Sequence, residues 1–298
     1  MRPPEPLVHA ARGVLMGAAD IVPGVSGGTV ALIVGIYDRL VRSVGALART
    51  GAALLALRFR AAREHVRDVD LRLLIPLALG VVAALGLGSL VIPPLLDGYP
   101  AETSAAFFGL IAASLPLPWG RIERPTRRLA AVVGVAAVTA FVLAGLPPRE
   151  IVDPALPIVF LSAMVALCAM ILPGLSGAYL LLILGVYGAS LTALRSGDVV
   201  YVATFAAGGV LGLGLFSRLL DHLLTHRHDV TMAALVGLMA GALRALWPWQ
   251  TEDRELLAVP LEAQTLTTVG VAVAAFVLLR LVVRLGTRAA AGSSPPAR

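Results

Sequence analysis

The chain has 298 residues, of which 58% are hydrophobic and only 14% are charged, and its mean hydropathy is +0.88. Because soluble domains carry about 25% charged residues, this composition excludes an ordinary soluble domain. It predicts an all-α integral membrane protein that forms a single membrane domain over residues 1–298. The net charge of +6 does not indicate a nucleic-acid partner, since the arginines behind it cluster in loops beside apolar segments.

The first apolar segment, about residues 13–41, is interrupted by a Pro-Gly break at 23–24. Residues 13–22, before this break, would form about 15 Å of helix, which reaches only the middle of a hydrocarbon core of about 30 Å. We therefore expect a re-entrant hairpin, which enters the membrane and returns to the side it came from. A second Pro-Gly break, at 173–174, predicts a second hairpin over about 158–194.

The other long apolar segments predict single membrane spans, because most approach the length of about 20 helical residues that a bilayer requires. The expected elements after the first hairpin are, in chain order, a basic cytoplasmic insertion at 49–72, spans at about 73–96 and 104–118, a linking span at 129–146, the second hairpin, spans at about 199–220 and 231–248, a C-terminal span at 264–286 and a disordered tail at 289–298.

Two parts of the chain repeat one another. Residues 19–37, ADIVPGVSGGTVALIVGIY, match residues 169–187, AMILPGLSGAYLLLILGVY, at an offset of 150. Residues 80–115 match residues 208–243 at an offset of 128. The smaller second offset means that the first copy carries extra residues, and the basic insertion accounts for them.

This pattern predicts inverted repeats. Repeat one, 13–118, and repeat two, 158–248, each comprise a re-entrant hairpin and two spans, and the linking span between them inverts the second copy. The C-terminal span is expected to lie outside both repeats. The positive-inside rule then places most arginines and both termini in the cytoplasm, as in a multi-pass plasma-membrane protein. Four arginines remain on or near the outer side: Arg149, Arg195, Arg244 and Arg254.

Interrupted apolar segments at matching places in two halves are the best sequence indication of a transport site. The helix that restarts after each break presents free amide groups and the positive end of its dipole. We expect an anion such as a phosphate monoester, sulfate or carboxylate to bind where the two breaks meet. The expected contacts are Gly24, Ser26, Gly27, Gly28 and Thr29 in the first break, Gly174, Ser176, Gly177 and Tyr179 in the second, and Arg218 and Arg244 as charge partners.

Alternatives stay open for these residues. The glycines would also serve close helix packing, as small residues do in membranes, and the two arginines would also extend toward the membrane surface. Asp20 is the main acid inside the predicted membrane region, where a carboxylate is costly unless it is neutralised. We expect Asp20 to bind a coupling proton or ion, with a merely capping role as the alternative. Repeat two has Met170 at that place, so this role is asymmetric.

Four ordered motifs, GAADIVPGVSGGTVALIVGIYDRL, AMILPGLSGAYLLLILGVY, LFSRLLDHLL and GALRALWPW, resemble a membrane family once described only as a domain of unknown function and now associated with polyprenyl-phosphate translocation. The resemblance covers about residues 12–250. It implies a plasma-membrane carrier without enzymatic activity that returns undecaprenyl phosphate to the inner leaflet for cell-envelope synthesis. Its implied partners are the lipid phosphate and the bilayer.

Two other functions remain possible from the residues alone. One is a secondary transporter or channel for a small soluble anion, and the other is a membrane enzyme that acts on a lipid phosphate. The enzyme requires a nucleophile and a base, for which no arrangement is visible. No cofactor or metal is expected, and no nucleotide-binding motif is present in the sequence.

Overall fold

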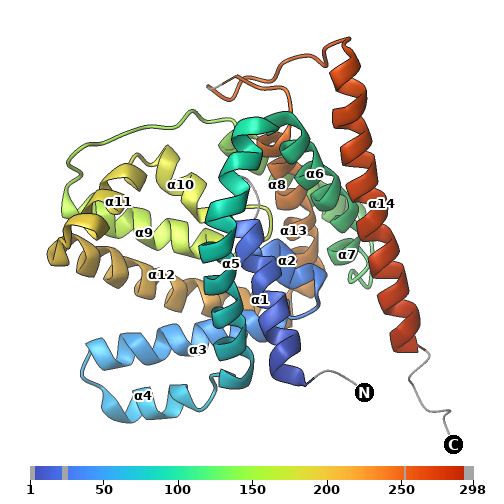
Figure 1. Ribbon diagram of the computed structural model, residues 1–298. Coiled ribbons are helices and arrows are strands. Elements are labelled where there is room, and N and C mark those ends of the chain that lie inside the picture. The colour runs from blue at the N-terminus through green and yellow to red at the C-terminus, as the bar shows by residue number, and fades with distance from the viewer. Residues whose placement is uncertain (1–3, 22–25, 252, 292–298) are drawn as a thin grey trace, which may run out of the picture.

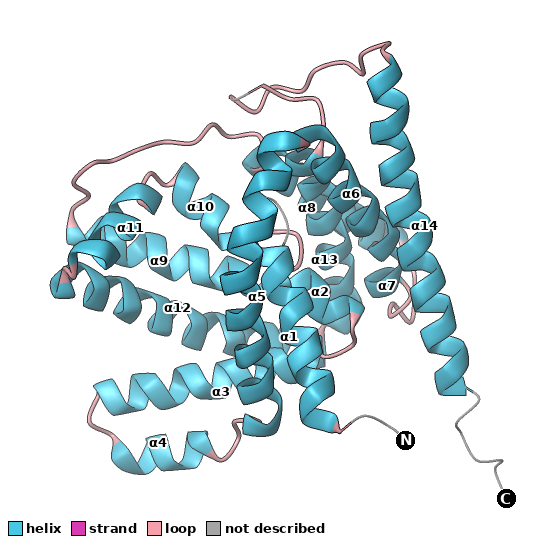
Figure 2. Cartoon of the chain, viewed as in Figure 1, coloured by secondary structure: helices cyan, strands magenta, loops and turns pink. Residues whose placement is uncertain are grey.

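The computed structural model describes residues 4–21, 26–251 and 253–291, and within these ranges the regular structure is entirely helical (Figure 1, Figure 2). The prediction of an all-α chain is therefore confirmed. The helices are α1 (Glu5–Ile21), α2 (Gly27–Ile33), α3 (Tyr37–Leu55), α4 (Phe59–Val66), α5 (Leu71–Gly98), α6 (Pro100–Ser114), α7 (Pro116–Trp119), α8 (Arg127–Leu143), α9 (Leu156–Ile171), α10 (Gly177–Ile183), α11 (Tyr187–Ser196), α12 (Val199–His226), α13 (His228–Ala242), the 3-10 helix η1 (Leu243–Leu246) and α14 (Ala263–Ala291).

Three of the described helices are long and apolar enough to cross a membrane: α12, α13 continued by η1, and α14. Helices α10 and α11 meet at an angle of 105° and would count as a fourth, broken span if taken together. The spans predicted near 73–96 and 129–146 lie in α5 and α8. The short one predicted at 104–118 is divided between α6 and α7, because Pro116 begins a new turn.

The helices at the two ends of the described chain extend beyond the limits expected from the sequence. Helix α1 begins at Glu5, well before residue 13, and its 17 residues span about 26 Å rather than about 15 Å. The early residues stay helical because they pack on α5, where a side chain at Gly80 would collide with the carbonyl oxygen of Ala10. At the other end, α14 continues to Ala291, so residues 289–291 are helical and the rest of the predicted tail lies outside the described residues.

Long helices pack in pairs that recur in the two halves of the chain. Helix α1 runs along α5, and α9 runs along α12 (Figure 1). In the first pair Gly80 lies against the carbonyl oxygen of Ala10, and in the second Gly208 lies against that of Phe160. The two glycines differ by 128 in number and their partners by 150, which are the two offsets of the sequence repeat.

The remaining long helices form two further pairs. Helix α6 packs along α14, and α13 packs along α8 (Figure 1). Gly109 lies against the carbonyl oxygen of Ala272 in the first of these pairs, and Gly237 lies against that of Val133 in the second. Thus α8, the predicted linking span, and α14, which was expected outside the repeats, make corresponding contacts. Each follows one half in sequence and packs on the other half.

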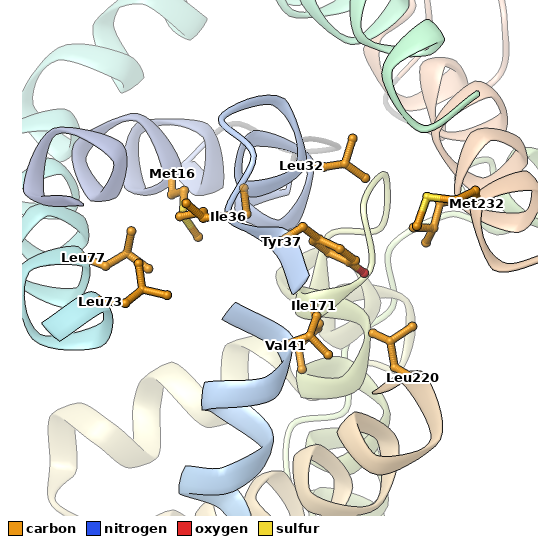
Figure 3. Packing of buried hydrophobic residues seen from close by; sticks show 12 residues of the cluster. Met16, Leu32, Ile36, Tyr37, Val41, Leu73, Leu77, Ile171, Leu220 and Met232 are labelled. Carbon is orange, nitrogen blue, oxygen red and sulfur yellow. The ribbon is translucent and has the colours of Figure 1, made fainter. Parts of the chain in front are cut away.

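A common apolar core holds the two breaks near one another. Its buried members include Ile36 and Tyr37 at the start of α3, Ile171 at the end of α9, Leu220 on α12 and Met232 on α13 (Figure 3). These residues come from segments that are far apart in the chain. The core therefore joins the helices that precede and follow both Pro-Gly breaks.

Charged pairs tie the ends of helices together at the side where α1 begins. Arg39 on α3 contacts Asp70 at 2.6 Å, and Arg121 contacts Asp38 at 3.3 Å. Asp70 also caps α5, because its carboxylate accepts a hydrogen bond from the amide of Leu73 at 3.1 Å. The hydrogen bond from the Arg39 guanidinium is the main reason that the pKa of Asp70 is lowered.

Candidate functional site

The two chain breaks meet through the side chain of Ser26. Ser26 caps α2, and its hydroxyl oxygen accepts a hydrogen bond from the amide of Gly28 at 3.1 Å. The same oxygen lies 3.3 Å from the carbonyl oxygen of Met170 and 3.2 Å from that of Leu172, so its proton can be donated to either one. Ser26 is buried, with 1% of its surface exposed. The beginning of α2 is therefore fastened to the end of α9.

A second contact joins the breaks in the opposite direction. The hydroxyl oxygen of Thr29, which is fully buried, accepts a hydrogen bond from the amide of Gly174 at 3.0 Å. Gly174 has a φ of +87°, in the left-handed region that favours glycine. A side chain there would also approach the backbone of Met239 to 2.8 Å. Gly24 in the first break lies outside the described residues.

Asp20 supplies a carboxylate to the start of α2. Its Oδ1 atom accepts a hydrogen bond from the amide of Gly27 at 2.6 Å, and the residue is exposed. A side chain at Gly27 would approach Oδ2 of Asp20 to 2.7 Å, and one at Gly28 would approach the carbonyl oxygen of Ile171 to 2.6 Å. Both glycines are therefore closely surrounded by protein, and the positive end of this short helix already faces a negative group.

The start of α10 differs from that of α2. Ser176 caps the helix by accepting a hydrogen bond from the amide of Tyr179 at 3.3 Å. The amides of Gly177 and Ala178 donate to no group among the described residues. Met170 cannot supply the carboxylate that Asp20 supplies to α2. Gly177 is buried, and a side chain there would collide with the carbonyl oxygen of Ala166, so the two amides lie without a hydrogen-bond partner from the described chain in a closely packed place.

Two arginines gather around Tyr179, on the first turn of α10. The Tyr179 hydroxyl lies 2.7 Å from the carbonyl oxygen of Leu146, to which it donates a hydrogen bond, and the Arg254 guanidinium lies 4.9 Å from the centre of its ring. Arg244 donates a hydrogen bond to the carbonyl oxygen of Arg254 at 3.2 Å and packs over the ring of Phe141 at 4.6 Å. The structure therefore brings Arg244 toward the second break.

The structure separates Arg218 from the breaks. Arg218 lines a different cavity, between α3, α4 and α12, together with Arg49 and Arg58. Arg254, in contrast, was missed as a site residue. A signal for it was present in the sequence, because Arg254 is one of the few arginines predicted on the outer side, where the positive-inside rule gives arginine no topological role.

Within the described ranges, no group of three or more histidine, cysteine, aspartate or glutamate residues is arranged to hold a metal ion. Apart from the carboxylate of Asp20, the polar groups at and around the breaks are amides, hydroxyls and guanidinium groups. These are hydrogen-bond donors, and guanidinium in particular matches the oxygen atoms of a phosphate. The site is thus suited chemically to an anion.

Comparison with known proteins identifies related sequences. The profile of an undecaprenyl phosphate translocase-like family matches residues 16–259. The chain is similar to a polyprenyl-phosphate transporter of Vibrio cholerae, with 37% identity over 242 residues that cover 80% of this chain and 77% of the relative. It is also similar to a polyprenyl-phosphate transporter of Staphylococcus aureus, with 28% identity over 261 residues that cover 81% and 86% of the two chains. No solved structure matches the chain.

Proposed function

The chain belongs to the undecaprenyl phosphate translocase-like family, and we propose that it moves a polyprenyl phosphate of the undecaprenyl type across the plasma membrane. The lipid is returned to the inner leaflet for reuse in cell-envelope synthesis, without any covalent change, so the chain acts as a carrier and not as an enzyme. Both termini lie in the cytoplasm.

The observation that carries this proposal is the difference between the two joined helix starts. The start of α2 is occupied by Asp20, whereas the start of α10 keeps two free amides beside Ser176. Arg254, from the loop before α14, packs on the ring of Tyr179 in the first turn of α10, and Arg244 of η1 donates a hydrogen bond to the carbonyl oxygen of Arg254. A phosphate monoester carries a charge of about −1.5 to −2, and it would be held by the free amides and guided to them by the arginines.

The first break completes the site in this proposal. Ser26, Gly27, Gly28 and Thr29 keep the start of α2 in contact with the second break, and Gly24 belongs to the same segment. Asp20 binds a proton or a cation during the transport cycle. When its carboxylate is neutralised, its hold on the amide of Gly27 weakens, and that amide becomes a further donor for the phosphate. This competition couples lipid binding to the state of Asp20.

The proposed architecture is a pair of inverted repeats, each with a re-entrant hairpin and two spans. The recurring contacts of Gly80 with Ala10 and of Gly208 with Phe160 support it. Repeat one then comprises 13–118 with the cytoplasmic insertion 49–72, and repeat two comprises 158–248.

The orientation is tested by labelling cysteines from one side of intact vesicles. In a chain whose own Cys168 is replaced by serine, Arg63→Cys on α4 and Asp253→Cys in the loop before α14 are expected to react from opposite sides of the membrane. Labelling of both positions from the same side would exclude this topology.

The proposed substrate is tested by binding to the purified full chain. We expect undecaprenyl phosphate to bind and the neutral polyprenol not to compete. Arg254→Gln removes a charge-assisted contact worth about 1.5–3 kcal/mol, which corresponds to a loss of affinity of about tenfold to more than a hundredfold. The matched control is Arg195→Gln, which removes the same charge from the same predicted side. Equal binding of the phosphate and the polyprenol would refute the proposal.

A further inference from the structure

A second cationic site lies away from the two breaks. A cavity of about 250 Å³ opens between α3, α4 and α12, and Arg49, Arg58, His65 and Arg218 contribute to its lining. The rest of the lining is aliphatic, with alanines from α3 and α4 and leucines from α12. Arg49 and His65 are half-buried, and Arg58 and Arg218 are exposed. The cavity therefore combines an apolar wall with a group of cationic side chains from three helices.

These positive charges are not neutralised by the protein. No acidic residue lines the cavity, and Arg49, Arg58 and Arg218 form no ion pair with any carboxylate in the described part of the chain. Some basic residues of the same region are paired, since Arg39 contacts Asp70 at 2.6 Å and Arg60 approaches Glu64 at 3.9 Å. Several like charges around one cavity are unfavourable unless an anion binds among them.

The cavity lies between the two halves of the chain, and one of its walls comes from a segment that only the first half contains. Helix α4 forms one of its walls and lies within the basic insertion 49–72, which has no counterpart in the second half of the sequence. In the second half, α11 corresponds to α3 and ends at Ser196. Gly197, at a φ of +72°, then turns the chain directly into α12, with no helix equivalent to α4 between them. The insertion thus adds a cavity wall on the α3 side of the fold.

Helix α4 has the features of a helix that lies on a membrane surface. Leu57, just before it, is 75% exposed and Phe59 is 66% exposed, while Arg60 and Arg63 are exposed on the same short segment. Basic segments with exposed apolar side chains insert these side chains at the level of the lipid headgroups. The opening of the cavity would then lie at the depth of the phosphate groups of the adjacent leaflet.

We propose that this cavity binds the phosphate monoester headgroup of a lipid, and that the lipid is the transported polyprenyl phosphate on the cytoplasmic side. The identity of the lipid rests on the proposed function. A monoester offers close to two negative charges and three terminal oxygens, which suit three guanidinium groups better than the single charge of a phosphodiester lipid. Phosphate would thus be taken up beside Arg254 and released beside Arg218.

The test uses the full chain in neutral phosphatidylcholine nanodiscs and a polyprenyl phosphate with a photoreactive diazirine next to its phosphate. Labelled peptides are mapped after irradiation. We expect labelling both near the breaks and within residues 49–66. Arg49→Gln combined with Arg218→Gln is expected to reduce labelling of 49–66 at least tenfold and to leave labelling near the breaks unchanged. Arg63→Gln, which removes the same charge from a part of α4 that does not line this cavity, is expected to change neither.

Normal labelling near the breaks shows that a variant is folded. If the double variant loses this labelling, Arg218→Gln alone, at an exposed position, takes its place. Unchanged labelling of 49–66 in either pocket variant overturns the inference. If phosphatidylglycerol displaces the probe from 49–66 as readily as unlabelled polyprenyl phosphate does, the cavity is a phospholipid site. If inorganic phosphate displaces it equally well, the cavity is a free-phosphate site. Either result overturns the assignment. Failure of the proposed function gives a different result. A neutral polyprenol probe would then label both regions to the same extent as the phosphate probe.

Discussion

Thr29 and Gly174 form a hydrogen bond of 3.0 Å between positions that are 145 residues apart. The hydroxyl of one break thereby satisfies a backbone amide of the other, and Ser26 makes the reciprocal contact with the end of α9. A backbone group without a partner is costly inside a bilayer. Each interruption is therefore stabilised by the other, and the two breaks behave as one structural unit.

We predict that Thr29→Val destabilises the chain. Valine has nearly the shape of threonine but cannot accept the hydrogen bond, so the buried amide of Gly174 loses its partner at a cost of about 1–3 kcal/mol. The measurement is thermal unfolding in detergent. The matched control is Thr139→Val on α8, whose exposed hydroxyl bonds only within its own helix, to Val135 at 2.9 Å. Equal stability of the Thr29 and Thr139 variants would contradict the proposed joint.

Gly80→Ala and Gly208→Ala are predicted to destabilise the chain by similar amounts. Each added methyl group would collide with a carbonyl oxygen, of Ala10 in one case and of Phe160 in the other, and overpacking of this kind typically costs about 1–3 kcal/mol. Gly134→Ala is the control, because a methyl group there meets nothing within 4 Å. Unfolding measurements that find one of the two substitutions harmless would argue against equivalent helix pairs.

Asp70 provides a prediction about pH. Its pKa is lowered in the folded chain, chiefly by the hydrogen bond from Arg39, so its stabilising effect is complete above the ordinary aspartate pKa of about 3.9 and is lost as the pH falls below it. Asp70→Asn keeps a residue that caps helices well but removes the charge. At neutral pH it should lower the free energy of unfolding by about 0.2–1 kcal/mol. The difference from the wild type should shrink in acid, and a difference independent of pH would rule out the ion pair as its source.

Asp20→Asn is predicted to fold normally, because the amide oxygen of asparagine can still accept the hydrogen bond from Gly27. It should nevertheless alter the dependence of transport on pH or on cations, since its side chain cannot take up a proton or hold a cation as a carboxylate does. The measurement is transport in reconstituted vesicles over a range of pH and salt. Asp153→Asn, at an exposed loop position, is the control. Identical profiles for Asp20→Asn and the wild type would remove the coupling role.

The sequence was sufficient to predict the features that depend on pattern and composition. The hydropathy predicted an all-helical chain, the ordered motifs predicted the family, and both predictions are confirmed. The repeat offsets of 128 and 150 also match the two helix contacts, Gly80 with Ala10 and Gly208 with Phe160. A glycine inside a long helix is typical of close packing on a neighbouring helix. The placement of a substrate at the breaks stays a prediction.

Other features depend on contacts between distant segments, which no local pattern reports. The helical residues of α1 before residue 13 were not foreseen, because they pack on α5. The packing of α8 on the second half and of α14 on the first half was not foreseen. An apolar helix indicates that it is covered, but its sequence does not indicate which helix covers it. The bond from Gly27 to Asp20 and the approach of Arg254 to Tyr179 likewise arise only when the breaks and loops come together.

Transport of the lipid itself tests the central claim most directly. In proteoliposomes that contain the purified full chain and undecaprenyl phosphate, an external phosphatase that cannot cross the membrane cleaves only lipid that reaches the outer leaflet. We predict that the wild-type chain exposes the inner-leaflet pool to cleavage, that Arg254→Gln slows this exposure, and that Arg195→Gln does not. An inner-leaflet pool that stays as protected as in liposomes without protein would contradict translocation by this chain.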